Sequence, residues 1–229
     1  MRAAIASVVA LLVIAAGIDL ALTRAAERRA SEQASILLAA PATVDFRGWP
    51  VSVRLLFGAI PAVDLHATAV PTDSGVPLRT LDATLTRVRL RLGDLASGEL
   101  PAEAGDGTFT ATLDDEGVRA ILGDLAQAGT VELVPGRVRL TVSRFTVEAG
   151  VSLEDAVLVL TPVTGPRGLP DRFEVPLPEL PPGIHVERVE VLEGALQLAG
   201  AFTPEALAPF GTQRDARNTP LGGERLFSP

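Results

Sequence analysis

The stretch "LTRVRLRLGD", residues 85–94, alternates apolar and basic side chains. Side chains of a β-strand point alternately to the two faces of its sheet. Two sets would therefore face apart, with Val88, Leu90 and Leu92 on one side and Arg87, Arg89 and Arg91 on the other. The segment predicts a strand with one apolar and one arginine-rich face. The apolar face must pack against something, and the identity of that partner determines the fold and bears on function.

Period-two alternation recurs through most of the chain after residue 43. It is clearest in residues 63–69, 81–92, 109–113, 138–153, 157–160 and 189–198. Two of these strands change phase midway, at Thr86–Arg87 and at Ser143–Arg144. One extra residue at each point keeps a single apolar face, and such a residue is a β-bulge. Bulges bend and twist strands, so we expect a long, strongly curved sheet.

The composition indicates a folded chain with an aliphatic interior. Of the 229 residues 47% are apolar, but only 4% are aromatic. The formal net charge of −8 argues against a nucleic-acid partner and against docking on anionic lipid, because both need clustered basic residues. The chain has no cysteine, which excludes disulfides, thiolate metal sites and a catalytic thiol.

The N-terminus contains a long uncharged segment. Residues 3–18 are apolar or small, close to the upper length of a signal-peptide core and short of the roughly 20 residues that span a bilayer. We therefore expect residues 1–22 to be a signal peptide or membrane anchor and the body to be exported. The alternative is a cytoplasmic body behind an uncleaved segment, because Arg24, Arg28 and Arg29 outnumber Arg2 across it.

A helix with two distinct faces is predicted after this segment. Its polar face carries Arg24, Glu27, Arg28, Ser31, Glu32 and Ser35. Its opposite face carries Leu22, Ala26, Ala30, Ala34 and Leu37. This spacing is that of an amphipathic helix, and Pro41 ends it. The narrow stripe of small residues could lie along a sheet.

Further helices are predicted at residues 114–129 and 53–57. The acidic residues 114–116 lie where a helix N-terminus favours anions, and Gly129 is placed to end the first of these helices. Gly58 is placed to end the second. Residues 204–229 are rich in Pro, Gly, Arg and Asn without periodicity, and we predict a disordered tail.

The polar residues do not form a recognisable catalytic or metal-binding set. His66 and His185 occupy outward positions of their strands, and no third metal ligand accompanies them. Motifs for nucleotide binding or for a nucleophile elbow are absent. We therefore expect no catalytic residue, metal or cofactor. Arg87, Arg89 and Arg91 are either a solvated outer face or a phosphate-headgroup contact, which guanidinium geometry suits.

Three segments together resemble one family. Residues 45–60 match its turn and short helix through Gly48, Trp49, Pro50, Leu55, Leu56 and Gly58. Residues 81–100 match its long strand and following turn through Leu81, Asp82, Val88, Leu92, Asp94, Leu95 and Gly98. Residues 173–200 match its C-terminal signature through Pro176, Leu177, Pro178, Leu180, Pro181, Gly183, Val191, Gly194 and Leu196. Over about residues 18–203 the chain resembles the LmeA-like phospholipid-binding proteins of actinobacterial cell envelopes.

The resemblance and the alternation together lead to a fold prediction. We expect an α+β fold in which an elongated, strongly curved antiparallel sheet wraps one or two helices, as in the tubular lipid-binding folds (TULIP or BPI-like). The alternative is a closed up-and-down β-barrel. The lipid-binding domain would span residues 23–203. Its predicted lipid-facing residues are Leu81, Leu85, Val88, Leu90, Leu92, Val138, Leu140, Val142, Val147 and Val151.

The resemblance implies an exported or envelope-attached protein that binds phospholipid and acts at a membrane surface. Enclosing acyl chains is favourable because each buried methylene contributes about 0.8 kcal/mol. The alternative is a non-enzymatic envelope scaffold that recruits a glycosyltransferase or another envelope-assembly enzyme, with its apolar face filled by its own helix. A lipase or esterase is the least supported of the three.

Overall fold

The computed structural model describes residues 21–48, 60–72, 74–89, 105–123, 126, 129–142, 145–166, 168–178, 180 and 182–207. The six-stranded sheet has the order β1 (Ala42–Arg47), β2 (Ile60–Val70), β3 (Leu78–Val88), β4 (Gly107–Leu113), β11 (Ala195–Phe202) and β10 (Ile184–Leu192). The five-stranded sheet has the order β5 (Thr130–Val134), β6 (Arg137–Val142), β7 (Phe145–Glu154), β8 (Val157–Thr164) and β9 (Phe173–Pro176). Among the described residues, the helices are an N-terminal helix over residues 21–38, α4 (Asp115–Leu122) and the 3-10 helix η1 (Pro204–Leu207), and Ala126 is also helical.

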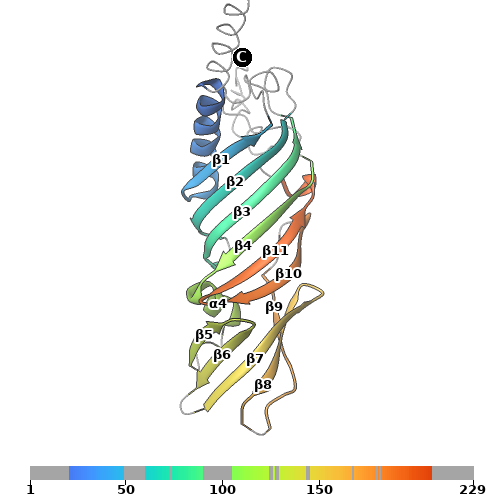
Figure 1. Ribbon diagram of the computed structural model, residues 1–229. Coiled ribbons are helices and arrows are strands. Elements are labelled where there is room, and N and C mark those ends of the chain that lie inside the picture. The colour runs from blue at the N-terminus through green and yellow to red at the C-terminus, as the bar shows by residue number, and fades with distance from the viewer. Residues whose placement is uncertain are drawn as a thin grey trace, which may run out of the picture.

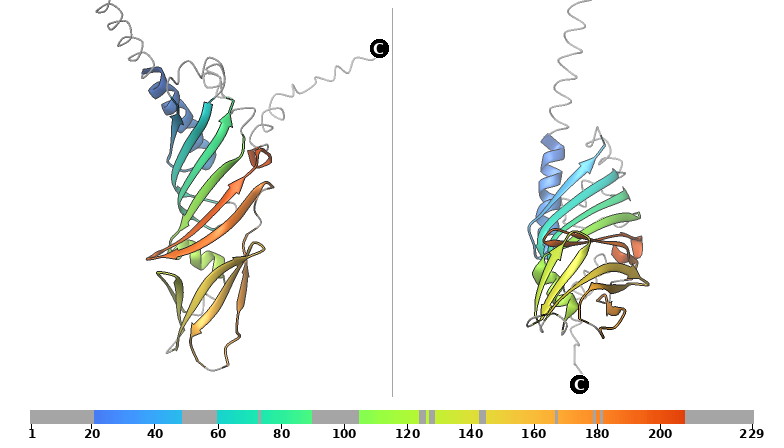
Figure 2. Two further views of the ribbon diagram at one scale, coloured as in Figure 1. Left: turned by 45° about the vertical axis from the view of Figure 1, so that its right-hand side comes forward. Right: turned by 60° about the horizontal axis from the view of Figure 1, so that its bottom comes forward.

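The two sheets lie end to end along an elongated molecule (Figures 1 and 2). The N-terminal helix lies beside β1 at one end, and α4 lies at the junction of the sheets (Figure 1). Every strand pair is antiparallel, so the predicted α+β class is confirmed. The expectation of one continuous sheet is wrong. Within the described residues each sheet keeps two edge strands, so the alternative of a closed barrel is also wrong.

Two hairpin turns join the sheets. The amide of Gly136, between β5 and β6, donates a 2.8 Å hydrogen bond to the carbonyl of Val191. In return, the amide of Gly194, between β10 and β11, donates a 3.0 Å bond to the carbonyl of Leu133. Both glycines have positive φ, at 75° and 65°, a conformation that two-residue hairpin turns favour. The end of β10 is thereby held against the end of β5.

One apolar core crosses this junction, and two smaller clusters lie near the N-terminal helix. The main cluster draws on both sheets and on α4, with Leu113, Leu133 and Leu196 each at most 2% exposed. A second cluster places Ala26 of the N-terminal helix against β1, β2 and β3. The inner faces of the two sheets are therefore parts of one apolar surface.

The phase change at Thr86–Arg87 is real, but it is not an extra residue in the β2–β3 ladder. Ala62 pairs with Thr86 and Ile60 with Val88, in the same register as the rest of the two strands. Arg87 instead adopts a left-handed conformation, with φ of 53°. Both strands change phase at this point, because Ile60 and Val88 are each 2% exposed. The prediction of a bulge between these strands is therefore wrong. The phase change occurs at the left-handed residue Arg87, and beyond it Ile60 and Val88 both face inward.

The second predicted bulge is a hairpin. Val142 pairs with Phe145, so β6 ends and β7 begins on either side of residues 143–144, which lie outside the described residues. In a two-residue hairpin, as in a bulge, the inward residue that follows Val142 is Phe145, three positions later in the sequence. The alternation pattern is therefore the same for both structures. The segment 189–198 is likewise two strands, β10 and β11, joined at residues 193–194.

The predicted start of α4 is confirmed, and its predicted end is wrong. The Asp114 carboxylate accepts hydrogen bonds from the amides of Glu116 and Gly117, which caps the helix. The helix ends at Gly123, whose φ is 53°, rather than at Gly129. The predicted helix at 53–57 lies outside the described residues. The domain boundaries at residues 22 and 203 stay predictions, although η1 continues the described structure to residue 207.

Candidate functional site

A row of apolar side chains crosses the inner face of the six-stranded sheet. Val44 pairs with Leu65, Leu65 with Ala83, and Ala83 with Phe109 on successive strands. Val44 is buried beneath the N-terminal helix. Leu65, Ala83 and Phe109 are only partly buried, although all three face inward. This row, which we call the inner row, is apolar surface that the protein does not fully cover.

Two phenylalanines lie over glycines of the neighbouring strand. Phe109 of β4 pairs with Gly200 of β11, and Phe202 of β11 pairs with Gly107 of β4. A Cβ atom at Gly107 would overlap the Phe202 ring, and one at Gly200 would lie 3.0 Å from Cε1 of Phe109. Such cross-strand pairing of an aromatic ring with glycine compensates for the missing side chain. Because the rings occupy the glycine positions, they lie along the sheet.

The N-terminal helix forms a wall at the edge of this face. Ala26, Ala30 and Ala34 pack toward β1, β2 and β3, as the predicted stripe of small residues requires. Leu22 and Leu37, which were assigned to the same stripe, are 41% and 45% exposed. The packed face of the helix is therefore narrower than predicted.

Three polar residues of this helix contact the sheet edge instead of water. The Ser31 hydroxyl accepts a hydrogen bond from the Val44 amide, and Glu27 Oε1 accepts one from the Phe46 amide at 3.2 Å. Ser35 accepts a bond of 2.9 Å from the Ala42 amide and donates to the Ala42 carbonyl. The three acceptors satisfy alternate amides of edge strand β1. The predicted polar face is therefore partly an internal contact.

The inner face of the five-stranded sheet is filled at its base by α4. Val118, Ile121 and Leu122 of α4 cover side chains of β6, β7, β8 and β11. The cavity left between them has a volume of about 10 Å³, roughly that needed for one water molecule. Between α4 and these strands there is no space for an acyl chain.

The predicted lipid-facing residues divide between the two sheets. Those on β3 are Leu81, Leu85 and Val88, and those on β6 and β7 are Val138, Leu140, Val142, Val147 and Val151. Leu90 and Leu92 lie outside the described residues. Val88 and Val138 are 2% and 4% exposed, so they are core residues. Sequence reasoning omitted the inner-row residues Leu65, Ala83 and Phe109, although all three lie in strands that it identified by alternation.

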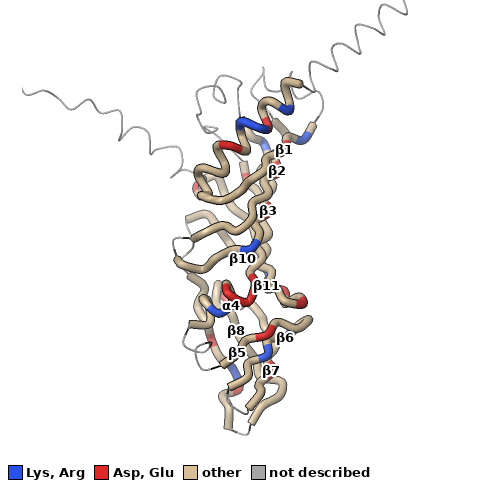
Figure 3. The backbone as a smooth tube through the Cα atoms, turned by 90° about the vertical axis from the view of Figure 1, so that its left-hand side faces the viewer, with Lys and Arg blue, Asp and Glu red and all other residues tan. Residues whose placement is uncertain are grey.

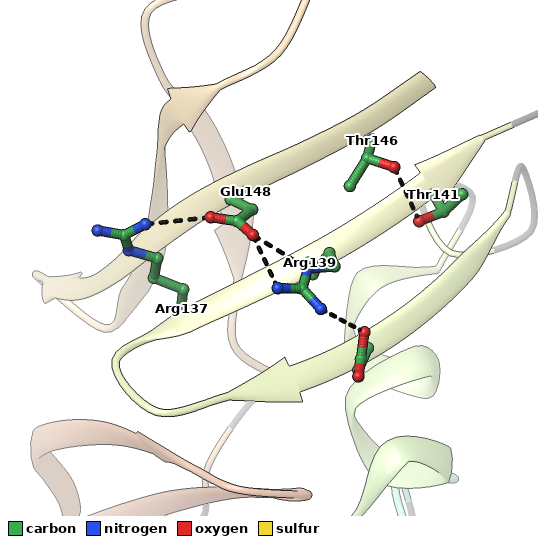
Figure 4. Close-up of polar contacts among 6 residues, drawn as sticks. Arg137, Arg139, Thr141, Thr146 and Glu148 are labelled. Carbon is green, nitrogen blue, oxygen red and sulfur yellow. Dashed lines mark hydrogen bonds and ion pairs between the residues drawn. The ribbon is translucent and has the colours of Figure 1, made fainter. Parts of the chain in front are cut away.

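Several arginines of the outer faces are paired with carboxylates. Arg87 forms a 2.8 Å ion pair with Asp106, and both side chains are mostly exposed. Arg137 and Arg139 both bond Glu148, and Arg139 also reaches Glu132 at 2.9 Å (Figure 4). Arg89 lies at the end of the described segment that includes β3, and Arg91 lies outside the described residues.

The Glu148 network shifts the titration of its members. Hydrogen bonds from Arg139 and then from Arg137 hold the pKa of the Glu148 carboxyl below its usual value. Hydrogen bonds to Glu148 and Glu132 raise the pKa of Arg139 above its usual value. Arg87, Arg137 and Arg139 are thus each paired with an acid of the protein itself, and a headgroup contact of Arg87 stays a prediction.

The two histidines lie on outward positions of different strands. His66 Nδ1 is 2.6 Å from a carboxylate oxygen of Asp82, and both side chains are about half exposed. His185 is exposed on β10. Among the described residues, no three acidic or histidine side chains are grouped to hold a metal ion. The described part of the chain also contains no helix of the length and hydrophobicity needed to span a bilayer.

Comparison with known proteins adds one match. The family model described as LmeA-like phospholipid-binding matches residues 15–201. No curated protein and no solved structure shows a significant match. The matched range includes both sheets, α4 and the N-terminal helix.

Proposed function

The chain belongs to the LmeA-like phospholipid-binding family, and from this premise we propose that it holds phospholipid acyl chains against the inner row of the six-stranded sheet. The observation that supports this proposal most directly is that Leu65, Ala83 and Phe109 face inward and remain partly exposed. The base of the other sheet is filled by α4. The inner row of the six-stranded sheet is therefore apolar surface that a ligand could cover.

Energetics favour an apolar ligand at this place. Each methylene removed from water contributes about 0.8 kcal/mol, so partial enclosure of a long acyl chain gives useful affinity. The rings of Phe109 and Phe202 lie close to glycines of the neighbouring strand, and the helix wall limits the face on one side. The headgroup would lie at the rim, where it remains hydrated.

We extend the proposal to architecture and location. The elongated, end-to-end arrangement of two antiparallel sheets is compatible with a tubular lipid-binding fold. Residues 1–22 would direct export, so that the protein would work in the cell envelope, as a soluble domain or anchored through that segment. In either form, transfer of lipid between membranes is the activity that an acyl-chain site would support.

Native mass spectrometry of the purified full chain with matched variants tests the site. Phe109→Arg places a charge in the inner row, whereas Thr110→Arg places the same charge on the opposite face of β4. We expect Phe109→Arg to lose most co-purifying phospholipid and Thr110→Arg to retain it. Ala83→Phe, which fills the row without a charge, should also lose lipid.

Circular dichroism melts show whether each variant is folded. A cooperatively melting Phe109→Arg or Ala83→Phe protein with the phospholipid content of the wild type would refute the site.

A second function has one observation in its favour. The base of the five-stranded sheet is packed against α4 with almost no free space, as expected of a scaffold whose apolar face is filled by its own helix. In that case the phospholipid-free protein would be fully folded, and an envelope-assembly enzyme would be its partner. A wild-type mass spectrum without phospholipid, together with a cooperative melt, would favour this function.

A further inference from the structure

Large apolar side chains are exposed at the end of the molecule farthest from the N-terminal helix. Phe145, the first residue of β7, is 49% exposed, and Val163, near the end of β8, is 55% exposed. The start of β7 and the end of β8 both lie at the free end of the five-stranded sheet (Figures 1 and 2). The two residues therefore belong to one tip.

Two more apolar side chains complete this tip. A Cβ atom at Gly165 would lie 2.7 Å from Cδ1 of Leu169 and 3.4 Å from Cγ2 of Val147, so these side chains converge around Gly165. Both are partly exposed. We call Phe145, Val147, Val163 and Leu169 the distal tip.

Phe145 and Val147 of the distal tip continue the apolar inner face of the five-stranded sheet beyond the reach of α4. Phe145 and Val147 have the same strand parity as Ala149 and Val151, which belong to the main core. The helix covers Val138 and Val151 near the junction. Toward the tip the same face opens to solvent, so the apolar surface leads from the core of the molecule to its end.

The described residues that form the distal tip are uncharged, although charged residues border them. Glu148 and Asp171 border the tip, and Arg144 and Arg167 lie outside the described residues. The described residues 141–142, 145–147, 161–166 and 168–170 themselves include no acidic or basic residue, and the described tube at the lower end of Figure 3 is tan. Pro162, Pro166 and Pro170 lie among them. Proline has no backbone N–H, so this segment exposes fewer donors that would need a partner outside water.

We propose that the distal tip inserts into the headgroup and acyl boundary of a phospholipid bilayer. This proposal rests on the proposed function, since it supplies the contact through which bound phospholipid would reach a membrane. A protein of net charge −8 is not attracted to anionic lipid, and insertion of apolar side chains does not need such attraction. The partner is therefore bilayer lipid, and zwitterionic vesicles suffice to detect it.

The lack of cysteine in the chain allows a site-specific test. Val163→Cys and, as a matched control, Thr108→Cys on the exposed outer face of β4 are each labelled with an environment-sensitive fluorophore in the full chain. On addition of phosphatidylcholine vesicles we expect the label at 163 to brighten roughly twofold and to be quenched by spin-labelled lipid, as for an interfacial residue. The label at 108 should not respond.

An unchanged signal at 163, or an equal response at both positions, would overturn the proposal. Because the free end of the five-stranded sheet lies far from the N-terminal helix (Figure 2), tethering through the N-terminal segment alone would not bring a label at 163 into lipid.

Two variants separate this proposal from the proposed function. Adding Phe145→Asp to the labelled protein should abolish the vesicle response and leave co-purifying phospholipid unchanged. Phe109→Arg should do the reverse, with lipid lost and the tip response retained. If Phe145→Asp does not melt cooperatively, Leu169→Asp takes its place, and a folded acidic variant with the full vesicle response contradicts insertion by the tip.

Discussion

The Ser31 hydroxyl accepts a 2.8 Å hydrogen bond from the amide of Val44, which joins the N-terminal helix to the edge of the six-stranded sheet. Glu27 and Ser35, four residues to either side, bond the amides of Phe46 and Ala42, two residues to either side of Val44. Four helical residues rise about 6 Å and two strand residues about 6.7 Å, so the two spacings nearly match. The helix thus occupies the place of a neighbouring strand.

Ser31→Ala removes the central contact of this edge. The Val44 amide would lose its acceptor while Val44 itself is 8% exposed, and an unsatisfied buried amide costs about 1–3 kcal/mol. We expect the urea midpoint of unfolding to fall accordingly. Glu32→Ala, an exposed neighbour on the helix, is the control and should change stability by less than about 0.5 kcal/mol. Equal midpoints for Ser31→Ala and wild type would show that the contact does not stabilise the helix.

Gly200→Ala tests the close contact between β11 and its neighbours. A Cβ atom there would overlap the His185 carbonyl of β10 and press on the Phe109 ring of β4. Overpacking of this kind costs about 1–3 kcal/mol, so we expect a lower melting temperature. Gly150→Ala is the control, because the nearest atom to its Cβ would be 4.0 Å away. A Gly200→Ala protein as stable as Gly150→Ala would mean that the strands separate freely there.

Ala156→Gly should stabilise the β7–β8 hairpin. Asp155 and Ala156 form its two-residue turn with φ of 47° and 62°. Such turns favour Asp-Gly, because a Cβ atom is strained at positive φ. We expect a gain of about 0.5–1 kcal/mol in the free energy of unfolding, since relief of strain outweighs the entropy cost of glycine. Ala199→Gly, within β11, should lower that free energy, and a loss of stability in both variants would contradict the turn assignment.

Glu148→Gln should alter the acid sensitivity of the fold. The pKa of Glu148 lies below its usual value of 4.5, because Arg139 and Arg137 donate hydrogen bonds to its carboxylate. A carboxylate with a lowered folded pKa stabilises the protein above its unfolded pKa, and this contribution is lost as the pH falls through the folded value. We therefore expect Glu148→Gln to be less stable than wild type at neutral pH, with the difference shrinking below pH 4.5.

Urea titrations at neutral and acidic pH measure the effect of Glu148→Gln. Glu187→Gln on exposed β10 serves as the comparison. A stability difference between Glu148→Gln and wild type that does not change with pH would rule out the charge of Glu148 as its source.

Local patterns were sufficient for most of the strands, for the start of α4 and for the family. Alternation identified most of the strands, the acidic residues 114–116 predicted the start of α4, and the three matched segments indicated the family that the profile confirms. These features depend on residues near one another in the chain. Their physical basis, side-chain direction and helix capping, is local as well.

Alternation did not reveal how strands connect. At residues 143–144 the apolar, inward-facing positions change from even to odd residue numbers. A bulge and a two-residue hairpin both produce this change, so the inward positions of Val142 and Phe145 agree with either structure. Only the pairing of β6 with β7 distinguishes them. The same limit explains why residues 189–198 read as one strand although a turn divides them.

The sequence by itself determined which face of its sheet each strand side chain lies on. Only the tertiary structure decided what covers that face. Val138 and Phe109 are both inward residues of strands, but α4 buries the first, and the second remains partly open. Likewise Ser31 lies on a polar helix face that is turned toward β1. Burial and hydrogen-bond partners come from segments distant in the chain, so no local periodicity contains them.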